Sequence, residues 1–227
     1  MEAPLAKRAV AEFVGTALLL AGVVGSGIMA ERLSAGNTAV ALLANTIATG
    51  GVLVAIILAF GSISGAHFDP AVTLSNALQS GIPWREVPVY IAAQLAGALL
   101  GVAVANTMFA LPVFFASHHA RHGFPVLLSE FVATFGLLTV IWGCVRFRSA
   151  ATPYAVAAYI VAAYWFTAST SFANPAVTIA RSLSDTFAGI APSDVAGYIA
   201  VEILGALAAT ALFAWLLPHA AALEEPF

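Results

Sequence analysis

Two boxes of the same pattern, an aspartate or asparagine followed by proline and alanine, hold the side chains best suited to meet a polar molecule. They are Asp69, Pro70 and Ala71 in the first box and Asn174, Pro175 and Ala176 in the second. Because such a residue before a proline is a typical helix N-cap, each box predicts a helix start. A helix N-terminus presents unpaired N–H groups and about half a positive charge. The boxes therefore indicate hydrogen bonding and electrostatic selection.

No part of the sequence indicates catalytic chemistry. The sequence contains no nucleophile–base set, phosphate-binding loop or cofactor motif, so we expect no enzyme and no cofactor. His118, His119 and His122 in "SHHARHG" have metal-ligand spacing, but the sequence places no cysteine or carboxylate beside them. A solvated external loop is the better interpretation, and no metal site is predicted.

The composition is too apolar for a soluble protein of this length. Of 227 residues, 61% are hydrophobic and only 8% are charged, and the net charge is −3. So few charges cannot cover a soluble globule, and no basic run suggests a nucleic-acid partner. The composition therefore predicts an integral membrane protein in contact with lipid.

Six apolar segments approach the roughly 20 residues that a bilayer crossing requires. They lie at roughly 9–30, 39–60, 87–110, 125–145, 152–170 and 195–217. In alternate loops, Lys7, Arg8, Arg85, Arg146 and Arg148 fall on one side, and Arg32, Arg121 and Arg181 fall on the other. Because basic residues favour the cytoplasmic side, both termini are predicted to be cytoplasmic.

The sequence also repeats itself once, in the same order. "AEFVGT" at 11–16 recurs as "SEFVAT" at 129–134, the box segment 68–78 recurs at 173–183, and 90–101 recurs at 198–209. Three spans per copy is an odd number, so the second copy must enter the membrane inverted. We predict one transmembrane channel domain, 1–227, built from repeats at 9–110 and 125–217.

Each box opens a segment of about ten residues, or 15 Å of helix, which is half a bilayer. Non-helical backbone at that depth is tolerated only where protein or a water-filled cavity satisfies it. The boxes therefore predict two re-entrant half-helices that meet around a polar path. The alternative is that each box starts an ordinary loop helix at the membrane surface.

The boxes "SGAHFDPAVT" and "ANPAVT", together with "AEFVGT" and the duplicated layout, resemble the major intrinsic proteins, the aquaporins and aquaglyceroporins. The resemblance covers nearly the whole chain. It implies an all-α integral membrane fold with six transmembrane helices and two half-helices, assembled as a homotetramer. The chain looks most like bacterial aquaglyceroporins associated with arsenic resistance, which implies the bacterial inner membrane.

Position 69 departs from the pattern, because the resemblance implies asparagine where this chain has Asp69. A carboxylate caps a helix equally well, so the change is conservative in one interpretation. In the other, an ionised Asp69 offsets the positive helix ends and weakens cation exclusion, whereas a protonated one donates like asparagine.

The resemblance also implies a ring of four residues on the outer side of the boxes, one of them an arginine. Here that arginine is replaced by Val177, and spacing from the boxes places Thr49, Ala162 and Ser171 in the other positions. Since none of these is aromatic or charged, a wide aperture is expected.

Other polar residues have two interpretations each. Arg181, one turn beyond Val177, either faces the solute in a vestibule or reaches the interface or Asp185. The resemblance suggests that Glu12 and Glu130, at equivalent positions, accept hydrogen bonds from the re-entrant loops, with proton coupling as the alternative. His67 either lines the inner pore or packs beside the loop.

We therefore expect a passive channel for small uncharged solutes: glycerol-like polyols, urea, neutral metalloid hydroxides such as arsenous acid, and water. Inverted repeats with broken helices also build alternating-access carriers. The rival is a proton-coupled secondary transporter that uses Asp69 or Glu12. A non-transporting scaffold would require the path between the boxes to be blocked.

Overall fold

The structure is a computed structural model that describes residues 3–217, and these residues are helical, as the sequence predicts. The α-helices are α1 (Leu5–Leu33), α2 (Thr38–Ser64), α3 (Pro70–Leu78), α4 (Val87–Met108), α5 (Phe124–Phe147), α6 (Thr152–Phe166), α7 (Pro175–Arg181) and α8 (Val195–Leu216). Two short 3-10 turns, η1 (Ser149–Ala151) and η2 (Pro192–Asp194), precede α6 and α8.

Five of the six predicted spans lie in helical segments long and apolar enough to cross a bilayer. The exception is α6, which has 15 residues and ends at Phe166 instead of continuing to residue 170. It ends there because Thr167 turns to an extended conformation, with φ −106° and ψ 140°. A helix of that length measures about 22 Å, and η1 extends it at its start.

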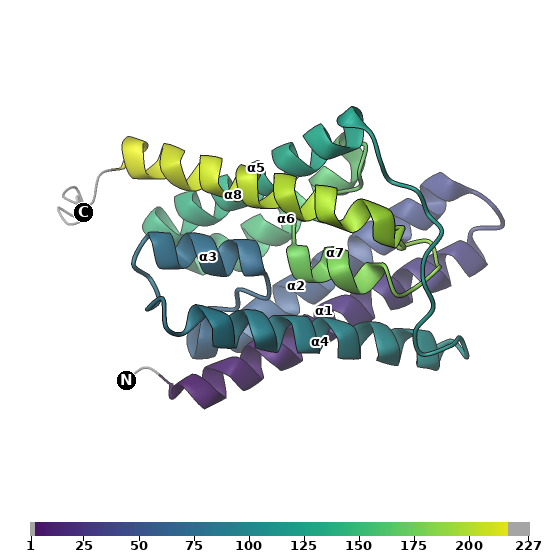
Figure 1. Ribbon diagram of the computed structural model, residues 1–227, viewed down its shortest axis with the longest axis horizontal. Coiled ribbons are helices and arrows are strands. Elements are labelled where there is room, and N and C mark those ends of the chain that lie inside the picture. Colours follow the sequence, from purple (N-terminus) through teal and green to yellow (C-terminus); the bar gives the residue numbers. More distant parts are fainter. Residues whose placement is uncertain (1–2, 218–227) are drawn as a thin grey trace.

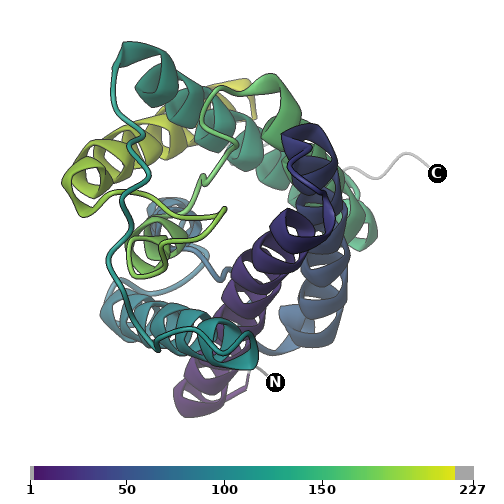
Figure 2. The same ribbon diagram turned by 90° about the vertical axis from the view of Figure 1, so that its right-hand side faces the viewer.

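The long helices run along the long axis of the molecule, and the short helices α3 and α7 lie end to end between them (Figure 1). In the end-on view, α7 lies in front of α3 and the long helices stand around the pair (Figure 2). α1 begins and α8 ends at the same end of the molecule (Figure 1).

Equivalent helices of the two halves make equivalent contacts. α1 packs against α4 and α2, and correspondingly α5 packs against α8 and α6. The halves meet where α2 contacts α6 and where each half-helix reaches the other half, α3 at α8 and α7 at α4. This packing surrounds both half-helices with helical protein, as buried non-helical backbone requires.

Glycine allows the two closest helix crossings. A Cβ atom at Gly97 of α4 would overlap the carbonyl oxygen of Phe13 in α1. At the equivalent crossing, a Cβ at Gly205 of α8 would overlap the carbonyl oxygen of Phe131 in α5. Small residues let membrane helices approach this closely, which supplies van der Waals packing where no hydrophobic force acts between helices.

We expect Gly97→Ala and Gly205→Ala each to lower the free energy of unfolding by about 1–3 kcal/mol, because the added methyl group must push two backbones apart. Gly51→Ala is the matched control, since Gly51 has open space around its Cβ position. The thermal midpoint of the detergent-solubilised protein measures the effect. Equal midpoints for Gly97→Ala and Gly51→Ala would contradict the packing argument.

Candidate functional site

The N-termini of α3 and α7 meet in the interior, and each is capped by its own box. Asn174 Oδ1 accepts the N–H groups of Ala176 at 2.9 Å and Val177 at 3.2 Å. Asp69 Oδ1 accepts the N–H of Ala71 at 2.7 Å. Proline occupies the first position of both helices. Both box residues are buried, at 3% exposed for Asp69 and 6% for Asn174.

The two box residues, Asn174 and Asp69, differ in the hydrogen bonds that they make to the opposite half of the protein. Asn174 Nδ2 donates to the carbonyl oxygen of Phe68 at 2.8 Å, which ties the second half to the first. An amide NH₂ has two hydrogens, so one remains for another acceptor. Asp69 has no amide, and its Oδ2 is buried without a hydrogen-bond partner among the described residues. An asparagine at position 69 could donate a hydrogen bond from the first half to the second, and the carboxylate of Asp69 cannot.

Glu12 holds the loop that leads into α3. Its Oε1 accepts the His67 N–H at 2.9 Å and the Ser64 hydroxyl at 2.7 Å. Its Oε2 accepts the Phe68 N–H at 2.6 Å and the Gln94 side-chain amide at 2.8 Å. Four donors therefore converge on one fully buried carboxylate in the first half.

Glu130 does the same for the loop that leads into α7. Its two oxygens accept the N–H groups of Phe172 at 2.9 Å and Ala173 at 2.8 Å. Glu202, which corresponds to Gln94, accepts the hydroxyl of Thr178 at 2.6 Å. The arrangement repeats the one around Glu12, with a second carboxylate in place of an amide.

The loops that these carboxylates hold are strained at equivalent positions. Phe68 and Ala173, directly before the boxes, have φ of 52° and 51°. Residues other than glycine rarely adopt this left-handed conformation, which persists only where the surroundings enforce it. The glutamates enforce it by binding the N–H groups of both residues.

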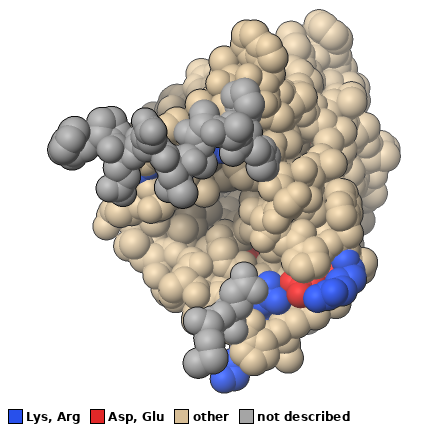
Figure 3. All heavy atoms as spheres, turned by 90° about the vertical axis from the view of Figure 1, so that its left-hand side faces the viewer, with Lys and Arg blue, Asp and Glu red and all other residues tan. Residues whose placement is uncertain are grey.

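A cavity of about 280 Å³ passes both boxes. Asp69 and Asn174 supply polar groups to its wall, and much of the remainder is apolar, with Val72 and Leu137 as examples. His67 also lines the cavity, and its Nδ1 lies 3.1 Å from the Thr73 hydroxyl. The surface is hollowed near the middle of the face at the end where α1 begins (Figure 3).

Three of the four predicted ring residues line this cavity: Thr49, Ser171 and Val177. Ala162 does not, and its side chain is exposed on the outside of α6. The spacing argument is therefore wrong at Ala162, because it counted back through a loop of unknown length. The cavity-facing residues of α6 recur every four positions, as expected for one helical face; they are Thr152, Val156, Ile160 and Tyr164.

Aromatic residues outside the predicted ring also border the path. Tyr164 lines the cavity, and its hydroxyl lies 3.4 Å from that of Thr49 on α2. Phe172 lines it as well, at the position that corresponds to His67 in the first half. The four-residue periodicity of α6 was the signal that could have identified Tyr164.

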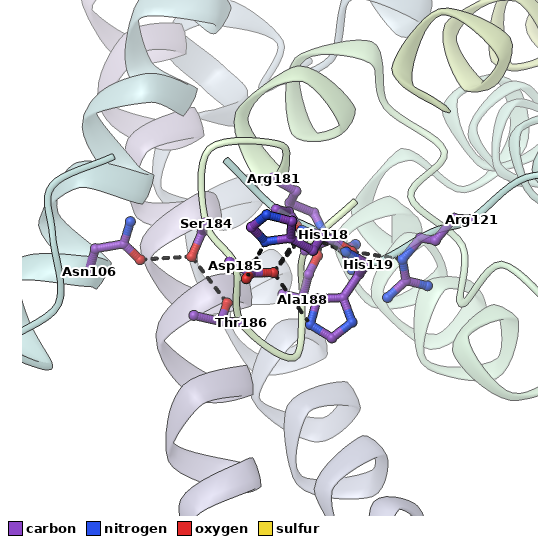
Figure 4. A network of polar contacts seen from close by, with 11 residues as sticks. Asn106, His118, His119, Arg121, Arg181, Ser184, Asp185, Thr186 and Ala188 are labelled. Atoms are coloured by element: carbon purple, nitrogen blue, oxygen red, sulfur yellow. Dashed lines mark hydrogen bonds and ion pairs between the residues drawn. The ribbon is translucent and has the colours of Figure 1, made fainter. Parts of the chain in front are cut away.

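Arg181 faces the cavity, so of its two interpretations the one that pairs it with Asp185 or the interface is wrong. The residue is 3% exposed and lines the cavity, and its Nε donates to the carbonyl oxygen of Ala188. Its Cζ lies 3.4 Å from the centroid of the Phe172 ring. Asp185 is bound by histidine instead (Figure 4).

The histidine cluster connects the loop before α5 to the loop after α7. The backbone N–H and Nδ1 of His118 each lie 2.8 Å from the Asp185 carboxylate, and His119 Nε2 lies 3.8 Å from it. These bonds, the backbone bond first, hold the pKa of Asp185 below its ordinary value. His122 lies 3.6 Å from Asp194.

The sequence has no carboxylate beside these histidines, but folding brings Asp185 and Asp194 to them from about 70 positions away. Residues 3–217 nevertheless contain no group of three or more metal-binding side chains placed to share an ion. The cluster serves as a contact between loops in this structure.

Comparison with known proteins places the chain in a family. Residues 1–152 match the family described as major intrinsic protein. Aquaglyceroporin AqpS of Rhizobium meliloti (strain 1021) is 52% identical over 219 residues, which cover 96% of this chain and 94% of AqpS. Putative aquaporin NIP4-1 of Arabidopsis thaliana is 33% identical over 141 residues, which cover 61% of this chain and about half (49%) of that protein.

The fold is similar to the X-ray structure of the aquaglyceroporin from Plasmodium falciparum, with a TM-score of 0.63. The match covers 94% of this chain and 95% of that one at 19% sequence identity, which supports the fold alone. The shared fold, the paired boxes and the matched sequence agree, and the chain belongs to the major intrinsic protein family.

Proposed function

We propose that the protein is a passive channel through which small uncharged solutes cross the membrane along the cavity between α3 and α7. Membership of the major intrinsic protein family makes it a membrane channel rather than an enzyme. The observation that carries the proposal is a cavity that passes both boxes, where Asp69 and Asn174 add polar groups to a largely apolar wall. We propose glycerol-like polyols, urea, neutral metalloid hydroxides such as arsenous acid, and water as the solutes.

The charge pattern supports uncharged solutes. The two helix N-termini each add about half a positive charge at the centre of the path, which repels cations. The apolar wall offers an ion little to replace its hydration, so entry of a bare ion is costly. Hydroxyl-bearing solutes can instead bond to Asn174, Asp69, and the Thr49–Tyr164 pair, all of which line the cavity.

Solutes larger than water are supported by the residue at position 177. Val177 is small and apolar and lines the cavity where the family pattern has arginine. The name of AqpS, an aquaglyceroporin, agrees with this size class. We further propose that the halves are inverted repeats, that the protein forms a homotetramer in the bacterial inner membrane, and that both termini are cytoplasmic.

A proton-coupled carrier is less well supported. Glu12 accepts four bonds from protein donors, two of them N–H groups of the loop before α3, and it does not line the cavity. Asp69 Oδ2 is the carboxylate oxygen at the cavity without a partner among the described residues. A channel gives glycerol flux that rises linearly with concentration and survives a proton uncoupler, whereas carrier flux saturates and stops.

We expect Val177→Arg to lower glycerol and urea permeability about tenfold, which corresponds to an added barrier of about 1.4 kcal/mol. Water permeability should fall much less, because arginine narrows the path and adds charge while leaving room for small molecules. Stopped-flow swelling of proteoliposomes measures all three, and Val177→Ile is the matched control. Equal loss for water and glycerol would count against the wide path.

Asp69→Asn is expected to lower proton flux into proteoliposomes while glycerol flux is retained. The substitution replaces the carboxyl group of Asp69, which can bind and release a proton, by an amide, which cannot. The amide NH₂ also places a hydrogen-bond donor where Oδ2 of Asp69 has no partner among the described residues. A pH-sensitive dye inside the vesicles reports the flux, and Glu31→Gln, on the exposed end of α1, is the control. Equally low proton fluxes in the parent protein and Asp69→Asn would refute a leak through Asp69.

A further inference from the structure

Two arginines at one end of the cavity are buried or partly buried without a carboxylate partner. Arg181 is 3% exposed, and its Nε donates to the carbonyl oxygen of Ala188. Arg121 is partly buried, and it donates to the carbonyl oxygens of Gly189 at 2.8 Å and Ser169 at 3.2 Å. Within residues 3–217, neither guanidinium takes part in an ion pair.

The nearby carboxylates are bound to other groups. Asp185 is engaged by His118 and His119. Asp194 accepts the backbone N–H of Arg121 at 2.6 Å and lies 3.6 Å from His122. Glu130 accepts two backbone N–H groups of the loop before α7. The guanidinium bonds of Arg181 and Arg121 therefore go to uncharged backbone carbonyls, and a buried cation without a directly bonded carboxylate is costly.

Arg181 is also held in one orientation. Its Cζ lies 3.4 Å from the Phe172 ring centroid, and Arg121 Cζ lies 5.1 Å from the same centroid. The bond to Ala188 (Figure 4) and the contact with this ring together fix the guanidinium. Its Nη1 is buried without a hydrogen-bond partner among the described residues, although Arg181 lines the cavity. A fixed guanidinium with a free donor suits a planar oxygen acceptor.

We propose that Arg181, reinforced by Arg121, forms a binding site for a small singly charged oxyanion at this end of the cavity. The anion supplies a negative charge beside a guanidinium that has no ion-pair partner among the described residues, and it accepts a hydrogen bond from Arg181. It is retained there because the path continues past apolar Val177, whose side chain offers an anion no polar contact. An anion at this site obstructs neutral solutes, and in this respect the inference rests on the proposed function.

The first test is equilibrium binding of nitrate to the full-length protein in detergent. At equal ionic strength, replacing gluconate with nitrate at about ten times its Kd should raise the thermal midpoint by roughly 3 °C. Arg181→Gln should abolish the rise. Arg32→Gln should keep it, because Arg32 likewise lies over a phenylalanine ring and binds a backbone carbonyl, but is exposed. A rise that persists in Arg181→Gln, or no rise in the parent protein, would overturn the site.

The second test is glycerol flux into proteoliposomes in the same two salts. Nitrate should slow flux through the parent protein in a saturable manner and leave Arg181→Gln unaffected. If Arg181→Gln does not fold, Arg181→Lys is the alternative variant, because it keeps the positive charge but loses the planar guanidinium fork. Nitrate should then bind about tenfold more weakly, as expected for the loss of one charge-assisted hydrogen bond. Undiminished nitrate affinity in Arg181→Lys would overturn the role of the fork.

The two readouts separate the two proposals. Absent glycerol flux with an intact nitrate-dependent midpoint would contradict the proposed solute path and still support the anion site. Normal glycerol flux that nitrate does not slow, together with an unchanged midpoint, would overturn the anion site alone.

Discussion

The structure depends on carboxylates that satisfy backbone which cannot be helical. A chain that turns back at the middle of a membrane leaves N–H groups without water, and each unsatisfied group costs several kcal/mol. Glu12 and Glu130 remove that cost by accepting pairs of N–H groups from the residues before α3 and α7. They also hold Phe68 and Ala173 in left-handed conformations, and thereby set where each box begins. A short half-helix at mid-membrane is possible because these two side chains are present.

The two halves repeat this arrangement, but the residues at the cavity differ between them. One direct bond, from Asn174 to Phe68, joins the boxes, because Asp69 cannot return it as a carboxylate. His67 in the first half corresponds to Phe172 in the second, and Asn76 corresponds to Arg181. The duplicated scaffold thus carries different chemistry at its two ends, with basic groups gathered at the end where α7 finishes.

The sequence predicted the features that depend on the internal repeat and on local helix-start signals. The half-helices begin at the predicted prolines, and Glu12 and Glu130 stand where their equivalence placed them. Errors arose where a contact depends on a loop whose course the sequence does not show. Ala162 was misplaced because the sequence does not show how many residues separate α6 from the second box, and the partners of His118 and Arg181 come from the segment after α7. Helical periodicity could have corrected the first error, but only tertiary structure shows the others.

Each re-entrant loop is satisfied largely by residues of its own half. Ser64, His67 and Phe68 bind Glu12, and Gln94 completes the set before the second half begins at α5. During synthesis on the ribosome, the first three spans can therefore insert and keep their loop in place while the rest of the chain is still being translated. Because Glu12 belongs to the first half and Glu130 to the second, each carboxylate can bind its own re-entrant loop before the two halves pack together.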